Sequence, residues 1–392
     1  KDSNWTTPAN WGVDESSYPG TGDTASFTGN TEVTVVLDAD ITISTIKTGT
    51  GGANKVTIDT KGHTLTTTNF TVNAGATGSY NTTTVITGNG KLTVSGTATV
   101  SSGAEMNVNA ANFSGTVTNN GTITCGDGAV TFGETTNSGG ITCSTTTTVF
   151  NDAVTVSAGG TIKGTTGTAE FKSTVTNNGT ITGGSGTIKF GGTVTNDGKI
   201  SGSFGTITFS GTYGSSTNAT AKLTASSGST YFYSDANFSY TTFDANNGTA
   251  LFNSATGQTL TLPNNTVSFN EITIQTSAGG FTAEGTESGN LSANKLTLAL
   301  ASTNVGAVFN VPVTAETIEN TSGNFDITFN AATEVSDVTN SVTFGTTGML
   351  TLGNDTTDTL TFAGGITHTQ GNTTLCGKII TNSAEVTLSD NT

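Results

Sequence analysis

Short runs in which apolar and polar residues alternate recur along the whole chain. Between residues 113 and 212, Phe, Val and Ile recur at offsets of 0, +4 and +10, and the unit repeats about every 19 residues. The positions that follow this rule are Phe113, Phe132, Phe150, Phe171, Phe190, Phe209, Val117, Val175, Val194, Ile123, Ile181 and Ile200. Strict alternation predicts β-strands, and a period near 20 residues is typical of a solenoid.

The repeat predicts an all-β fold, a right-handed parallel β-helix (β-solenoid) with coils of about 19 residues and about 20 coils in all. Phe, Val and Ile would point inward on short strands, and Thr outward. Corners at 119–121, 177–179 and 196–198 read Asn-Asn-Gly or Asn-Asp-Gly, which tolerates positive φ and allows stacked Asn ladders. A series of β-hairpins would also explain these turns, but not the spacing of three different apolar residues.

Residues 1–50 differ from the rest and are expected to form an N-terminal capping coil region. Residues 51–392 are expected to form one continuous β-solenoid, which is most regular at 113–212. Both tryptophans, Trp5 and Trp11, precede the first repeat. They are placed to cover the open end of a solenoid, which otherwise exposes its core and unpaired backbone groups. The alternative is that Trp5 and Trp11 form a stacking platform for sugars.

The N-terminal segment has an ordered set of residues: Trp5, Trp11, Pro19, the run Asp23–Phe27 and the run Thr34–Asp38. This order resembles the β-strand repeat associated with autotransporter passengers and related bacterial surface proteins. The 19-residue unit also resembles the coils of filamentous haemagglutinin-type adhesins. The resemblance implies an extracellular parallel β-helix at the cell surface, and it does not imply an enzyme.

Composition narrows the range of partners. Hydrophobic residues make up 32% of the chain, charged residues 10%, and 52 positions are Gly. Such values border on those of disordered chains, but the regular alternation argues for an ordered fold. The net charge is −16 and every basic residue is Lys, so we expect no nucleic-acid partner and no attraction to anionic lipid. No apolar run is long enough for a membrane span, so no direct membrane insertion is expected.

Three cysteines raise the question of a covalent link. Cys125 and Cys143 each follow an Ile of the repeat by two residues, so they would occupy one position in consecutive coils. Stacked coils lie about 4.8 Å apart, which allows a disulfide between Cys125 and Cys143. Two small buried thiols are the equal alternative. Cys376 has no partner in register.

Few residues are candidates for chemistry. Lyases of this fold use Arg or Lys as a base, commonly beside calcium, and the hydrolases use clustered Asp with His. This chain has no Arg, and His63 and His368 are some 300 residues apart, so both are expected to be solvated turn residues and no enzyme is expected. Asp355 and Asp358 could supply oxygen ligands to Ca²⁺, with solvated loop acids as the alternative; no other cofactor or metal is expected.

Two surface patterns suggest further functions. Thr-Ile-Thr runs such as 122–124 and 180–182 could stack into flat arrays that resemble those of ice-binding solenoids, although Thr also simply suits outward strand positions. An aromatic patch comprises Tyr231, Phe232, Tyr233, Phe238, Tyr240 and Phe243.

The expected function is mechanical. We expect an extracellular structural protein, a subunit of a cell-surface filament, sheath or layer that self-assembles through its solenoid ends or sides. The alternative is an adhesin passenger that binds host or surface glycans through Trp5, Trp11 and the aromatic residues 231–240. A polysaccharide lyase and an ice-binding protein rank after these two.

Overall fold

A computed structural model describes residues 2–12, 16–29, 32–51, 55–74, 82–216, 220–276, 278–285, 288–300 and 305–389. These residues form a parallel β-solenoid of about 16 turns with almost no helix. One 3₁₀ turn, η1 (Pro8–Asn10), lies near the N-terminus. The chain divides into two compact units, Lys1–Gly191 and Gly192–Thr392, which are described separately.

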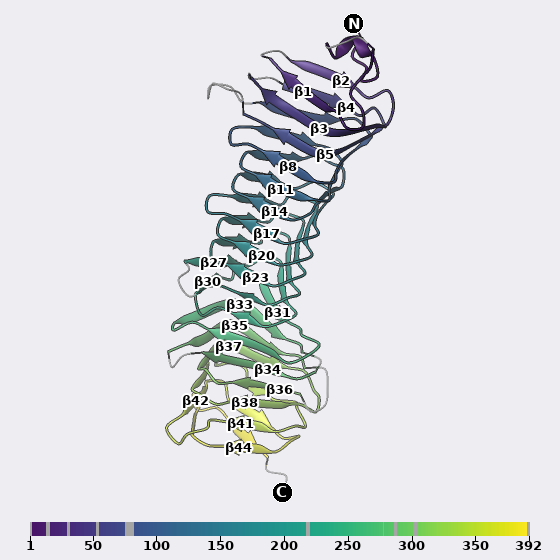
Figure 1. Ribbon diagram of the computed structural model, residues 1–392. Helices are drawn as coiled ribbons and strands as arrows, with labels where there is room; N and C mark the ends of the chain where they lie inside the picture. The colour runs from purple at the N-terminus through teal and green to yellow at the C-terminus, as the bar shows by residue number, and fades with distance from the viewer. Residues whose placement is uncertain are drawn as a thin grey trace. The chain divides into compact units, whose positions relative to one another are not determined.

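The first unit has three columns of parallel strands, here named faces A, B and C. Face A contains β2 (Val33–Val36), β4 (Lys55–Asp59), β6 (Thr83–Thr87), β9 (Glu105–Val108), β12 (Thr122–Cys125), β15 (Gly140–Thr142), β18 (Thr161–Lys163) and β21 (Thr180–Thr182). Face B contains the first halves of β3 (Ile41–Thr50) and β5 (Thr64–Val72), then β7 (Lys91–Val94), β10 (Ala111–Phe113), β13 (Val130–Phe132), β16 (Thr147–Phe150), β19 (Thr168–Phe171) and β22 (Thr187–Phe190). Face C contains β1 (Thr24–Thr28), the second halves of β3 and β5, then β8 (Thr97–Val100), β11 (Thr116–Asn119), β14 (Thr135–Asn137), β17 (Val154–Val156) and β20 (Val175–Asn177). Figure 1 shows β5, β8, β11, β14, β17 and β20 following one another in a single column.

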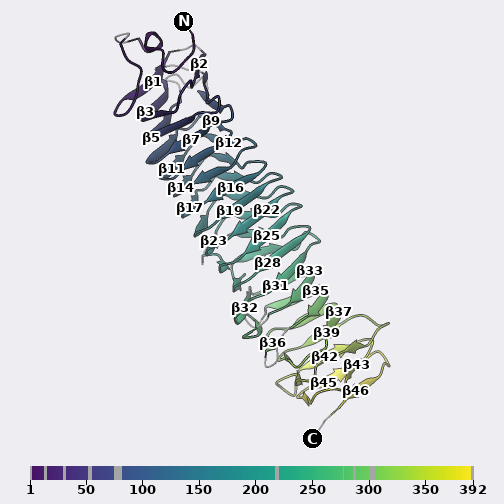
Figure 2. The ribbon, with the colours of Figure 1, turned by 90° about the vertical axis from the view of Figure 1, so that its right-hand side faces the viewer.

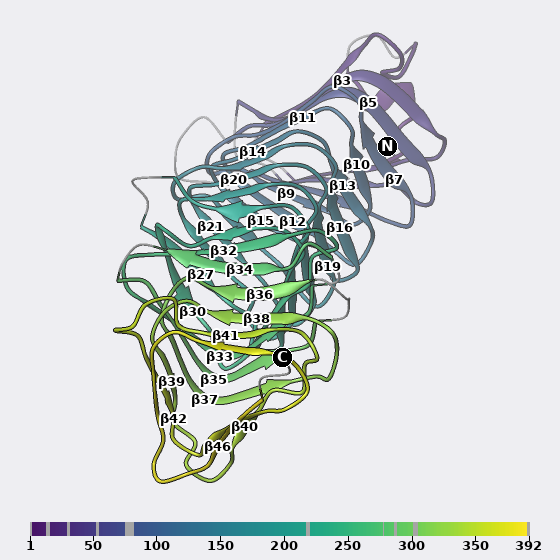
Figure 3. The same ribbon diagram turned by 90° about the horizontal axis from the view of Figure 1, so that it is seen from below.

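The second unit also has three columns, named faces D, E and F. Face D contains β23 (Val194–Asn196), β26 (Tyr213–Gly214), β29 (Ala236–Asn237), β32 (Gln258–Leu262), β34 (Phe281–Gly285), β36 (Gly306–Phe309), β38 (Asp326–Phe329), β41 (Leu350–Leu352) and β44 (Thr373–Leu375). Face E contains β24 (Lys199–Ser201), β27 (Ala221–Thr224) and β30 (Thr241–Asp244), and further on the first halves of β33 (Thr266–Ile274), β35 (Asn290–Leu298) and β37 (Val313–Asn320), with β39 (Thr333–Val335), β42 (Thr359–Phe362) and β45 (Lys378–Ile380). Face F contains β25 (Thr206–Phe209), β28 (Ser229–Phe232), β31 (Thr249–Phe252) and the second halves of β33, β35 and β37. A short sheet of β40 (Val342–Thr343), β43 (Ile366–His368) and β46 (Val386–Leu388) completes the last coils. Figure 3 shows the run of face D from β32 to β38.

The predicted solenoid is confirmed, and its coils average about 21 residues, close to the expected 19. The expected number of 20 coils was too high. Coil length varies because some corners carry longer loops: Ile123 pairs with Ile141, a step of 18 residues, whereas Lys55 pairs with Thr83, a step of 28.

Like residues stack on like residues inside the solenoid. All twelve Phe, Val and Ile positions of the repeat are at most 1% exposed. Along face B, the rings of Phe113, Phe132, Phe150, Phe171 and Phe190 stack with successive centroids 5.3, 5.0, 4.6 and 5.0 Å apart. Figure 2 labels β16, β19 and β22, which carry the last three of these rings. The alternation of the sequence therefore produces a continuous aromatic column, because every second residue of a strand points to the same side.

The Asn-Gly corners place their first amide in the core. Asn119, Asn177 and Asn196 are fully buried, as is Asn137 in register with Asn119. Asn119 Nδ2 donates to Asn137 Oδ1 at 2.8 Å, which is a hydrogen bond of the stacked kind that the sequence allows. The ladder thus lies inside the core. The positive φ that these corners would tolerate is not used at 119–121, 177–179 or 196–198. Gly is required there for another reason, since a Cβ on Gly121 would clash with the carbonyl oxygen of the preceding coil.

Candidate functional site

The N-terminal segment packs as a cap over the first coil. Trp5 is fully buried, its backbone N–H donates to Val36 O at 2.8 Å, and its Nε1 donates to Pro19 O at 3.0 Å. The turn η1 then brings Trp11 onto Trp5, with ring centroids 4.7 Å apart. Trp11 Nε1 donates to Trp5 O at 2.7 Å. Asn4 forms a parallel bridge with Val36, so the cap also covers part of the free edge of β2.

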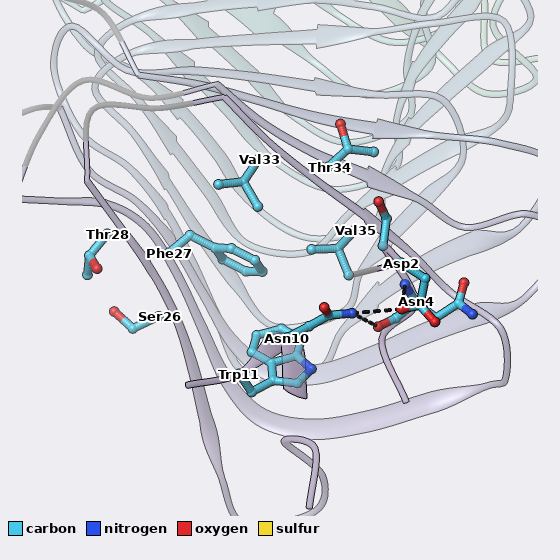
Figure 4. Close-up of a pocket in the computed structure, with 11 residues that line it drawn as sticks. Asp2, Asn4, Asn10, Trp11, Ser26, Phe27, Thr28, Val33, Thr34 and Val35 are labelled. Carbon is cyan, nitrogen blue, oxygen red and sulfur yellow. Dashed lines mark hydrogen bonds between the residues drawn. The ribbon is translucent and has the colours of Figure 1, made fainter. Parts of the chain in front are cut away.

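A pocket of about 300 Å³ lies between this cap and strands β1 and β2 (Figure 4). Phe27 and Val35 form its apolar floor, and both are buried. On the rim, Asn10 Nδ2 donates to Asp2 Oδ1 at 3.0 Å. The hydrogen bond from Asn10, with others from Thr7 and Asn4, holds the pKa of the Asp2 carboxyl below its ordinary value. The pocket thus lies where the cap covers the core only partly, and the polar groups on its rim form hydrogen bonds with one another.

These contacts favour the first of the two roles predicted for the tryptophans. Trp5 has no exposed surface to offer a sugar. Trp11 is half-buried, its ring lies against Trp5 and Phe27, and its indole N–H is already bonded. The geometry is that of a cap, in which each indole satisfies its polar group within the protein.

The two cysteines of consecutive coils are free thiols and form no disulfide. Ile123 pairs with Ile141, so Cys125 and Cys143 do share one position on face A, and both are buried. Burial raises the pKa of Cys143 to about 12, against a smaller opposing effect of a hydrogen bond with Thr148. Burial, with the neighbouring Cys143, also raises the pKa of Cys125 well above its ordinary value. Of the two predicted alternatives, a disulfide or two buried thiols, the structure therefore contains two buried, unreactive thiols.

The expectation that both histidines are solvated was wrong for His368. His368 lies on β43 with no exposed surface. Its Nε2 lies 3.1 Å from Thr346 O and its Nδ1 lies 2.8 Å from Thr373 Oγ1. Since a carbonyl only accepts, Nε2 carries the proton, and burial lowers the pKa of His368. His63 is half-exposed at a turn, with Nδ1 3.5 Å from Asp40 Oδ1.

The carboxylates proposed for calcium are engaged in turn formation. Asp355 Oδ1 accepts from Thr357 N and Thr357 Oγ1, both at 2.8 Å, which lowers the pKa of Asp355. Asp358 Oδ2 accepts from Asn354 N at 2.9 Å and from Asp355 N at 3.0 Å. Across the described ranges, no three His, Cys, Asp or Glu side chains gather closely enough to hold a metal ion. A calcium cage of six to eight oxygens would need additional ligands.

The outward threonines form a narrow column on face C. The residues that share one outward register position there are Thr71, Thr99, Thr118, Thr136, Thr155 and Thr176. The later strands of face C are three residues long and present one outward side chain each. On face A, the Thr-Ile-Thr rows are interrupted by Gly140 and Lys163. Thr147, Thr168 and Thr187 form a further outward column on face B. In the described strands of the first unit the outward threonines therefore stack in columns, and the Thr-x-Thr rows of face A are interrupted.

The aromatic patch divides into inward and outward residues. Phe232 and Phe238 are fully buried, whereas Tyr231 and Tyr233 lie on the outward side with parallel rings. Sequence reasoning missed Phe204, which is 80% exposed in the turn before β25. Its neighbour Ser203 has a φ of 52°, and this turn conformation places the Phe204 side chain in solvent.

No helix among the described residues has the length and apolar character needed to cross a membrane. Comparisons of the chain with protein-family models, with curated proteins and with solved structures found no match. The resemblance of the N-terminal segment to autotransporter-associated repeats therefore stays a prediction.

Proposed function

We propose that this chain is an extracellular structural protein, a subunit of a cell-surface filament, sheath or layer. The observation that carries the proposal is the stacking of identical inward residues on continuous parallel ladders: Phe on Phe, Ile on Ile and Asn on Asn. In such an array each coil contacts its two neighbours, so stability is added coil by coil along the axis. In a protein with a mechanical role, this repeated backbone ladder would resist deformation along the axis.

The energetics of one rung support a mechanical role. Full burial of a Phe side chain contributes roughly 2–3 kcal/mol, and each stacked aromatic contact adds about 0.5–1.5 kcal/mol. Phe150, Phe171 and Phe190 supply both terms on three successive rungs. A pulling force would therefore meet a series of similar barriers rather than one weak point.

The last described coil leaves apolar side chains and strand edges uncovered. Leu375 and Val386 are 46% and 44% exposed, although their partners in register, Leu352 and Ile366, are fully buried. Among the described residues, β44, β45 and β46 each pair with a strand on one side only. Such an edge accepts a further parallel strand, whether from additional coils or from a second subunit.

The cell-surface location rests on the resemblance of residues 1–50 to repeats of bacterial surface proteins. The acidic, Lys-poor composition is compatible with a hydrated exterior and offers no attraction to nucleic acid. No catalytic activity is part of the proposal.

Electron microscopy and light scattering over a wide range of protein concentration test the proposal. We expect concentration-dependent filaments or sheets. The double variant Leu375→Lys with Val386→Lys should shorten end-to-end assemblies, because it places charge on the exposed end of the core. Val338→Lys is the matched control, since Val338 is 59% exposed in the loop after β39. Particles that remain monomeric at every concentration would contradict the proposal.

A further inference from the structure

Two tyrosines, Tyr231 and Tyr233, lie side by side on the outer surface of the second unit. On β28 the inward residues are Thr230 and Phe232, both fully buried, so Tyr231 points outward. Tyr233 follows directly after the end of β28, and its ring lies beside that of Tyr231. The two rings are parallel to within 4°, and their centroids are 6.0 Å apart. Tyr233 is 40% exposed.

The fold does not require aromatic residues at these positions. In register with Tyr231 on the neighbouring strands of face F are Thr208 and Leu251, and Leu251 is followed in register by Thr273. Thr therefore satisfies the same outward position elsewhere in the unit. The core beneath is completed by Phe232, which stacks on Phe252 at 5.0 Å on the inward side. The tyrosine pair adds apolar surface outside a core that is already filled.

Polar groups lie beside the pair. Asn253 N donates to Phe232 O, which places Asn253 beside Tyr233 in the next coil, and Gln275 N donates to Phe252 O, which places Gln275 one coil further on. Asp235 follows Tyr233 by two residues, and its Oδ1 accepts from Thr259 N at 2.8 Å. Glu271 lies at the other end of its strand segment, where its Oε2 accepts from Thr249 Oγ1 at 3.1 Å. The pair therefore combines aromatic rings and hydroxyls with a neighbouring amide and, two residues away, a carboxylate that already accepts a backbone hydrogen bond.

This chemistry fits a sugar. The C–H face of a pyranose ring gains by covering an exposed aromatic ring, and its hydroxyls pair with amide and hydroxyl side chains. Two parallel rings two residues apart suit successive residues of an extended chain. An acidic glycan is disfavoured by the net charge of −16. A stable protein interface needs about 800 Å² per partner, far more than two tyrosines provide. We propose that Tyr231 and Tyr233 form a binding surface for a neutral linear glycan, independently of the assembly proposed above.

Calorimetric titration of the full-length chain tests this proposal. The probes are linear hexasaccharides of glucose, of N-acetylglucosamine and of mannose, with polygalacturonate as an acidic comparison. We expect at least one neutral probe to bind and polygalacturonate to bind more weakly. Loss of each ring should weaken affinity roughly fivefold, so Tyr231→Thr with Tyr233→Thr should weaken it roughly 25-fold.

Two controls separate ring loss from damage to the fold. Tyr231→Phe with Tyr233→Phe keeps both rings and should retain affinity to within about threefold. Tyr18→Thr removes a tyrosine that is 41% exposed in the first unit and should leave binding unchanged. The proposal is overturned if no neutral probe binds, if the double Thr variant binds like the unmodified protein, or if the double Phe variant loses binding. None of these results bears on whether the protein forms filaments.

Discussion

The aromatic column makes a quantitative prediction for Phe171→Ala. Phe171 is fully buried and stacks on Phe150 at 4.6 Å and on Phe190 at 5.0 Å. Removing a buried Phe side chain costs about 3–5 kcal/mol, which includes the transfer term and the cavity. Neighbouring rings on a rigid parallel ladder cannot close the gap, because strand spacing fixes their positions along the axis. We therefore expect a loss near the top of that range, about 4–5 kcal/mol.

Urea denaturation and amide hydrogen exchange measure this loss and its extent. Exchange should accelerate in β16, β19 and β22, whereas β3 and β5, several coils away, should keep their protection, since coils couple to their neighbours. Phe204→Ala is the control: Phe204 is 80% exposed, and its removal should change the free energy of unfolding by less than about 0.5 kcal/mol. A loss below about 1 kcal/mol for Phe171→Ala would refute the proposed stacking energetics.

Three further predictions concern buried polar groups. Asn137→Ala removes the donor to Thr161 O at 2.9 Å and should lower the free energy of unfolding by roughly 1–3 kcal/mol in denaturant titration. Cys143, whose pKa is raised to about 12 by burial, should resist alkylation at pH 8 in the folded protein, while half-buried Cys376 reacts; mass spectrometry reads out both. Because burial lowers the pKa of His368, the unfolded chain binds a proton first as the pH falls. The free energy of unfolding should therefore be highest above about pH 6.5 and should decline below it. In His368→Gln this decline should be smaller.

Each of the three has an internal comparison. Asn137→Val should cost less than Asn137→Ala, because Val156 occupies the same inward position one coil further. Equal losses would mean that filling the space is irrelevant. Alkylation of Cys143 at the rate of Cys376 would show that the coil opens readily. The matched comparison is His63→Gln, since His63 is half-exposed. If the dependence of stability on pH is unchanged in both His368→Gln and His63→Gln, His368 is excluded as the titrating group.

The sequence predicted the parts of the fold that depend on side-chain period. Phe171 and Phe190, with Val175 and Val194, identified the inward positions because a solenoid repeats the same environment at every coil. The same reasoning failed at irregular corners, where loop length is free to change without altering strand register. The count of coils was wrong for this reason.

Buried polar residues were the second limit of the prediction. Asn119 stands in a run of Thr, Asn and Gly that has the composition of a turn, yet its amide lies in the core and bonds to Asn137. His368 follows Thr367 on a short strand, and only the paired coils show that it points inward. Local sequence does not reveal such positions, because the partners that satisfy them come from adjacent coils.

The glycine corners determine how closely successive coils of the first unit approach one another. Gly121, Gly139, Gly160 and Gly179 lie one above another, and a Cβ on each would clash with a carbonyl oxygen of the coil before it. Side chains at these points would act as wedges that open the stack on one edge. We therefore expect a single substitution at one such corner to bend the first unit locally, while the aromatic column keeps its register.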